Sequence, residues 1–133
     1  MCGIVGFSSK DGKYDLLKIK FLLYWNSIER GKDATGIYTV ESGIVKDNEE
    51  AKKFINNKHK IDKIKPANLL IGHVRAKTVG HNTVDNAHPF EYGDLVGAHN
   101  GSLTNHLSLI RQYGFNTCSY NVDSQVLISA LNE

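Results

Sequence analysis

The chain begins with a thiol placed directly ahead of a short apolar segment, a pattern typical of a buried strand. Cys2 precedes the run from Gly3 to Ser8, which ends in a Ser-Lys-Asp-Gly turn signal. If Met1 is removed, Cys2 carries a nucleophile and a free amine on one residue. An α-amino group has a reference pKa of about 7.7–8.0, so part of it is neutral near pH 7 and can act as a general base. The segment predicts a self-activated nucleophile, or else an ordinary small apolar residue.

Composition limits the class of protein. The 133 residues, 41% of them hydrophobic, suit one globular domain, taken as residues 1–133. We expect neither a membrane span nor a secretory signal, because no apolar run is long enough. Two cysteines, Cys2 and Cys118, give no disulfide framework and favour the reducing cytoplasm. A net charge of +2 gives no reason to expect nucleic-acid binding.

Apolar residues at helical spacing predict a long helix from residue 14 to residue 30, ended by Gly31. We expect this helix to bury one stripe of side chains against the core. The stripe consists of Leu17, Phe21, Tyr24 and Ile28, widened by Leu16, Ile19 and Leu23.

The remaining chain alternates short strands with helices. Residues 30–36 read as a polar loop, 37–40 and 44–46 as a hairpin, 49–57 as a short surface helix and 69–74 as a strand. An irregular stretch over 76–89 precedes a strand at 95–98, a helix to Tyr113 capped by Thr104 or Asn105, and a last helix capped by Asp123. In that last helix we expect Val126, Leu127, Ala130 and Leu131 to share one side. The pattern favours a layered domain of mixed α and β structure.

Attack on an amide requires a nucleophile, a base, oxyanion donors and groups that fix the substrate. Asn100 and Gly101 follow a predicted strand, where a side-chain amide and a backbone N–H can converge on one oxygen; a tight hairpin turn is the competing interpretation. Arg75 follows an apolar strand and can grip a carboxylate in a bidentate fork, or is a surface arginine. Asp123 can hold an ammonium group, or only cap its helix.

Taken together, the motifs resemble the class II glutamine amidotransferases, whose N-terminal-nucleophile glutaminase domains include those of amidophosphoribosyltransferase and glucosamine-fructose-6-phosphate aminotransferase. Six segments occur in the family's order over nearly the whole chain. They are the stretches 1–6, 30–37, 72–80, 86–90, 98–105 and 123–126.

The resemblance implies a role for each matching residue. Cys2 attacks the glutamine side-chain amide, releases ammonia and leaves a glutamyl thioester that water hydrolyses to glutamate. Asn100 and Gly101 form the oxyanion hole. Substrate binding falls to Arg75, Thr78 and His88 at the α-carboxylate and to Asp123 at the α-ammonium, while Arg30, Asp33 and Gly36 order the site. The implied fold is α+β, an αββα sandwich of the N-terminal-nucleophile hydrolases. No metal or cofactor is implied.

The chain departs from the family pattern at a few positions. Ala76 stands where an aromatic residue is usual, Val79 replaces a histidine, and Gln125 replaces an acid. The sequence also stops one helix after Asp123, so we expect a shortened fold, with the ammonia acceptor on a partner protein or a second chain that completes the sheet. A homo-oligomer would cover an exposed sheet edge in the same way.

Two other interpretations remain open. His99, His106 and Cys118 suggest a metal site, although their spacing matches no compact ligand cluster. Alternatively, the chain keeps the fold as a non-catalytic glutamine-binding or regulatory protein.

Overall fold

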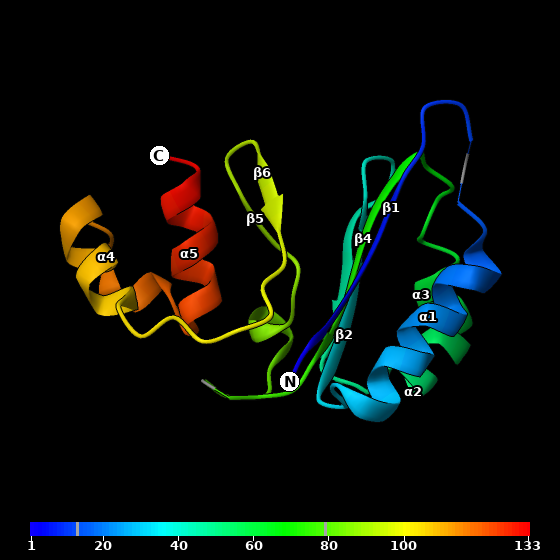
Figure 1. Cartoon of the computed structure of the whole chain (residues 1–133), viewed down its shortest axis with the longest axis horizontal. Helices are drawn as coiled ribbons and strands as arrows, with labels where there is room; N and C mark the ends of the chain where they lie inside the picture. Colours follow the sequence, from blue (N-terminus) through cyan, green and yellow to red (C-terminus); the bar gives the residue numbers. More distant parts are fainter. Residues whose placement is uncertain (13, 79) are drawn as a thin grey trace.

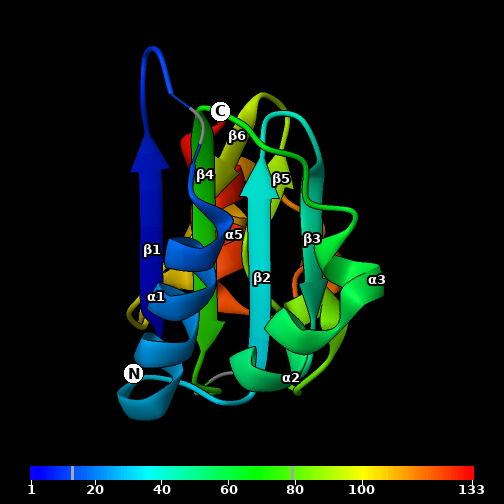
Figure 2. The same ribbon diagram turned by 90° about the vertical axis from the view of Figure 1, so that its right-hand side faces the viewer.

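The computed structural model describes residues 1–12, 14–78 and 80–133, in which a four-stranded antiparallel sheet separates two layers (Figure 1). The strands are β1 (Gly3–Ser8), β2 (Ala34–Thr39), β3 (Gly43–Asp47) and β4 (Leu69–Arg75). They lie in the order β1-β4-β2-β3, which leaves β1 and β3 as the edges (Figure 2). One face carries α1 (Leu16–Glu29), α2 (Ala51–Asn56) and α3 (Lys58–Ile61).

The second layer lies on the other face of the sheet and comes from the C-terminal half of the chain (Figure 1). A short hairpin of β5 (Phe90–Tyr92) and β6 (Leu95–Gly97) stands between the sheet and α5 (Asp123–Leu131), with α4 (His106–Tyr113) outermost. Single 3₁₀ turns occur at Val84–Asn86 and Thr117–Ser119. The α+β class is therefore confirmed, with two strands in the second sheet of the described chain.

Most predicted elements are confirmed, with shifted ends. The strand at Gly3–Ser8 matches residue for residue, and the β2–β3 hairpin pairs Ile37 with Val45. The predicted loop at residues 30–36 is wrong in its second half, since β2 begins at Ala34. The sequence prediction missed β5 and α3. The predicted irregular stretch 76–89 holds only the 3₁₀ turn at Val84–Asn86 among its described residues.

The predicted buried stripe of α1 is wrong for its four central residues, which are all exposed, but is confirmed for Ile19 and Leu23, which were expected to widen it. Leu17 is 77% exposed and Phe21 is 60% exposed, whereas Leu23 is fully buried. The helix is apolar on nearly every side, so spacing alone does not tell which stripe faces the core. Its buried residues are Ile19, Leu23 and Ser27. The opposite stripe, with Phe21 stacked on Trp25, faces away from the sheet.

The last helix also differs from the expectation in detail. Its N-cap is Val122, so Asp123 lies in the first turn. Of the expected stripe, Val126 is buried but Leu131 is 67% exposed. Burial instead includes polar residues of the first turns, namely Asp123, Ser124 and Gln125, which turns this end of α5 into part of a polar interior.

Strand alternation divides the two faces of the sheet. On β4, Leu70 and Val74 point into the apolar core beneath α1, together with Val5, Leu23 and Phe54. Side chains of successive strand residues point to opposite faces. His73 and Arg75 therefore face the second layer, where both are buried.

Candidate active site

The second layer is held against the sheet by close backbone contacts. Lys46 of β3 donates to the carbonyl oxygens of Ala87 (2.7 Å) and Pro89 (3.3 Å). A Cβ atom on Gly36 would lie 2.0 Å from the carbonyl oxygen of His88, so only glycine permits this approach. Burial lowers the pKa of Lys46, opposed by the nearby charge of Asp85. These contacts place His88 over the centre of the sheet.

A narrow cavity lies where the N-terminus, the end of β4 and the start of α5 meet. Six of the residues expected at the site line it: Cys2, Arg75, Thr78, His88, Gly101 and Asp123. Four further lining residues are Ala76, His99, Val122 and Ser124. Residues from near the start of the sequence to near its end, from Cys2 to Ser124, thus line one polar cavity.

Cys2 is buried and fixed at the end of β4. Its Sγ atom donates to the carbonyl oxygen of Ala76 at 3.6 Å, and the Ala76 N–H points back to the sulfur at 3.4 Å. Because Cys2 precedes the first strand residue, it faces the same side of the sheet as Arg75. Main-chain contacts with Ala76 therefore hold the thiol at the cavity.

Two buried groups of opposite charge line the cavity. Arg75 is 4% exposed and donates from Nη1 to the carbonyl oxygen of His81 at 3.1 Å. Burial lowers the pKa of its guanidinium, while the charges of Cys2, Asp33 and Asp123 act to raise it; an arginine nevertheless stays protonated. A buried positive charge therefore lines the cavity.

Asp123 supplies the negative charge. It is 4% exposed, and its Oδ2 accepts from the N–H of Leu103 at 2.6 Å while its Oδ1 accepts from the N–H of Ser124 at 2.9 Å. These contacts fix the carboxylate and tie the 98–103 loop to α5. A carboxylate accepts about four hydrogen bonds, so it can also bind an ammonium group.

The remaining expected residues lie outside the cavity lining. Asn100 is exposed, whereas its neighbour Gly101 lines the cavity. Arg30 is exposed at the end of α1, with Nη1 3.9 Å from the sulfur of Met1. Asp33 accepts from the N–H of Lys77 at 2.7 Å and bridges two loops. Val79, named above as a departure from the family pattern, lies outside the described residues.

Three polar residues of the site have no place in the predicted glutamine site, and one of them, His99, was expected only as a candidate metal ligand. His73, His99 and Ser124 form a connected set of hydrogen-bonding groups with His88. A signal existed for His73, since it shares a strand and a face with Arg75. In the described part of the chain, no group of three His, Cys, Asp or Glu side chains is arranged to hold a metal ion.

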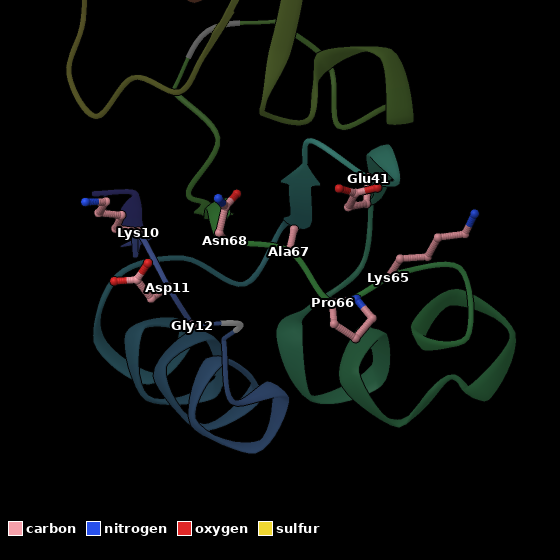
Figure 3. Close-up of a pocket in the computed structure, with 8 residues that line it drawn as sticks. All are labelled: Lys10, Asp11, Gly12, Glu41, Lys65, Pro66, Ala67 and Asn68. Carbon is pink, nitrogen blue, oxygen red and sulfur yellow. The ribbon is translucent and has the colours of Figure 1, made fainter.

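A wider hollow lies at the other end of the sheet. It is formed by residues after β1, at the β2–β3 turn and before β4, and the side chains of Lys10 and Lys65 extend away from one another (Figure 3). Cys2 precedes β1, so the length of that strand separates this hollow from the Cys2 thiol. No helix in the described residues combines the length and apolar character that crossing a membrane requires.

Sequence comparison identifies relatives of the chain. Amidophosphoribosyltransferase of Methanothermobacter thermautotrophicus is 30% identical over 98% of this chain, and that of Haemophilus influenzae is 32% identical over 98%. Glutamine–fructose-6-phosphate aminotransferase of Methanosarcina acetivorans is 31% identical over 96%. No model of a protein family matches the chain.

The chain spans 29%, 27% and 21% of the length of these three relatives. Similarity to two differently named transferases over almost all of this chain points to what they share. The chain is therefore homologous, over nearly its whole length, to the class II glutamine amidotransferases.

Proposed function

We propose that this chain is a glutaminase that hydrolyses the side-chain amide of glutamine and supplies ammonia to an acceptor on a partner protein. The observation that carries the proposal is the cavity that joins Cys2, Arg75 and Asp123. A nucleophile, a buried cation and a buried anion match the carboxamide, α-carboxylate and α-ammonium of one small amino acid. The relatives' names support the class of reaction, since both describe transferases and one names glutamine.

In the proposed reaction, the Cys2 thiol attacks the carboxamide carbon and its proton passes to the α-amine of the same residue. The C–N bond then breaks, the nitrogen leaves as ammonia with that proton, and a thioester remains. Water attacks the thioester, which releases glutamate and restores the thiol. The two steps together restore the thiol and the free amine of Cys2, so the reaction consumes only glutamine and water.

The amine takes part only when Cys2 is the first residue. Met1 is 79% exposed, which leaves it accessible to an aminopeptidase. For the oxyanion, the proposal assigns the N–H of Gly101, which lines the cavity, and the side chain of Asn100, which must turn inward from its exposed position. Arg75 and Thr78 bind the α-carboxylate and Asp123 the α-ammonium.

The proposal includes a partner because free ammonia is of use only next to an acceptor. The relatives are several times longer than this chain, and their names mention a phosphoribosyl group or fructose 6-phosphate. We propose an acceptor domain on another protein, or a second copy that covers the open edges β1 and β3.

The test is glutamate release by protein whose N-terminus is shown by intact mass to be Cys2. We expect turnover from processed protein and none from a form that retains Met1. A diazoketone analogue of glutamine should add its mass to the peptide that begins with Cys2, and not to the exposed Cys118. Glutamine binding without any turnover of processed protein, alone or with a partner, would instead favour the non-catalytic alternative.

A further inference from the structure

Two buried histidines, His73 and His88, make direct contact next to the cavity that contains Cys2. The Nδ1 atoms of His73 and His88 lie 3.2 Å apart, and their rings meet edge to face with centroids 4.0 Å apart. On its other side, His73 places Nε2 3.2 Å from the carbonyl oxygen of His99. The two rings therefore form a chain of hydrogen bonds that ends at His88.

The chain of contacts fixes where each proton lies. A carbonyl oxygen only accepts, so His73 carries its proton on Nε2. Burial lowers the pKa of His73 to about 4, which leaves the ring neutral at pH 7 with a bare Nδ1. His88 must then donate from Nδ1. Burial and the nearby positive charge of Arg75 lower its pKa to about 2, so the ring is neutral and its Nε2 carries no proton.

The bare Nε2 of His88 is buried, and no group among the described residues donates to it. His88 lines the cavity together with Cys2, Arg75 and Asp123. Buried polar atoms without a partner are rare and costly in folded proteins. An acceptor in this position is therefore matched to a donor that arrives with a ligand.

We propose that His88 is a specificity-determining residue whose Nε2 accepts a hydrogen bond from an N–H group of the bound substrate, with His73 as the positioning residue that sets its tautomer. This deepens the proposed function and rests on it for the identity of the ligand. It gives His88 a different role from contact with the α-carboxylate, because a lone pair repels a carboxylate oxygen.

Glutamine offers two N–H sources, the side-chain carboxamide and the α-ammonium. If the carboxamide is the donor, His88 also separates substrate from product, because glutamate presents a carboxylate at the same place. If the ammonium is the donor, His88 acts together with Asp123. Both cases share one chemistry, an N–H donor facing a neutral imidazole nitrogen.

The first experiment determines the tautomer. Nitrogen NMR of the ring of His88 distinguishes a protonated nitrogen from a bare one, and resonances are assigned with His88→Gln and His73→Leu. We expect a protonated Nδ1 and a bare Nε2 from pH 5 to pH 8, and a shift of the Nε2 resonance when glutamine is added. A protonated Nε2 in the free protein, or a ring that titrates near its ordinary pKa, overturns the proposal.

The second experiment measures binding in a Cys2→Ala background, so that glutamine is not consumed. Loss of one neutral hydrogen bond weakens binding about fivefold, and loss of a bond from a charged donor about tenfold or more. With the carboxamide as donor, His88→Leu weakens glutamine about fivefold and leaves glutamate unchanged. With the ammonium as donor, it weakens glutamine and glutamate alike and leaves 4-carbamoylbutanoate unchanged. Unchanged affinity for all three ligands overturns the proposal.

Three controls separate this role from a structural one. His88→Gln keeps an acceptor oxygen and should restore most of the affinity. His73→Leu removes the atom that fixes the tautomer and should weaken glutamine binding, although His73 does not line the cavity. His59→Leu, on the exposed side of α3, should change nothing. If the Cys2→Ala parent fails to bind glutamine, both the proposed function and the proposed hydrogen bond from His88 to glutamine are refuted. The NMR measurement of the His88 ring still tests the tautomer independently.

Discussion

Cys2 and Ala76 are tied to one another in both directions, since the Ala76 N–H points to Sγ at 3.4 Å and the Ala76 carbonyl oxygen accepts from it at 3.6 Å. Ala76 directly follows Arg75, so the same strand end positions the Cys2 thiol and the buried guanidinium. Any movement of this strand end therefore shifts both the Cys2 sulfur and the Arg75 guanidinium, to which we assign the attack and the binding of the substrate carboxylate.

Replacing the nucleophile should separate chemistry from binding. We expect Cys2→Ala to abolish glutamate release while glutamine still binds, because the thiol forms the covalent bond but contributes little to recognition. Cys118→Ala is the matched control and should keep full activity, since Cys118 is exposed and is not among the residues that line the cavity. Residual turnover by Cys2→Ala that matches the parent would remove Cys2 from the mechanism.

Replacing the two charged residues should raise KM more than it lowers kcat. Arg75→Lys loses the planar fork that binds a carboxylate through two parallel hydrogen bonds. Asp123→Asn loses the negative charge for the α-ammonium and keeps the shape of the side chain. Asp94→Asn, an exposed acid in the β5–β6 turn, serves as the control. Steady-state kinetics that give parental KM values for both variants would place the substrate charges elsewhere.

Replacing Asn100 tests its proposed role in the oxyanion hole without disturbing the fold. Because its side chain is exposed, Asn100→Ala should unfold at the same temperature as the parent. Loss of one oxyanion donor typically lowers kcat by about 10²–10³. Equal kcat in variant and parent would leave the Gly101 N–H as the donor that matters and refute the role of Asn100.

The two stripes of α1 should differ sharply in their effect on stability. Leu23→Ala creates a cavity in the core and should lower the free energy of unfolding by about 2–5 kcal/mol. Phe21→Ala lies on the exposed stripe and should change it by about 0.5 kcal/mol or less. Urea unfolding of both variants measures the difference. A larger loss for Phe21→Ala would mean that this stripe is covered in solution.

The buried histidines predict a loss of stability in weak acid. Both pKa values in the folded protein, about 4 for His73 and about 2 for His88, lie below the ordinary value of 6.5. The unfolded chain therefore binds more protons below pH 6.5, so the stability present above that pH is lost as the pH falls toward 4 and below. Each such histidine changes the free energy of unfolding by at most about 1.4 kcal/mol per pH unit.

Urea unfolding at pH 7 and pH 5 measures this effect. We expect the difference in unfolding free energy between the two pH values to shrink in His73→Leu and to stay unchanged in His59→Leu. Equal pH dependence in the parent and in His73→Leu would show that His73 does not carry the effect.

The sequence by itself determined the local parts of this protein. Short apolar runs marked β1 and β4, and the position of Arg75 at the end of β4 followed from the same pattern. Glycine and asparagine marked the ends of α4, where Gly114 adopts φ 67° and Asn105 precedes the first turn. These features depend on neighbours within a few residues, which a linear pattern records directly.

Only the tertiary structure decided the features that depend on residues far apart. The apolar residues of α1 lie on most of its sides, so no stripe is uniquely buried until packing on the sheet selects Leu23 over Phe21. The three-residue β5 is too short for a pattern and forms because β6 pairs with it. The tautomer of His88 depends on His73, fifteen positions earlier, and on the carbonyl of His99. Contacts of this kind arise when the second layer packs on the sheet, and no spacing in the sequence encodes them.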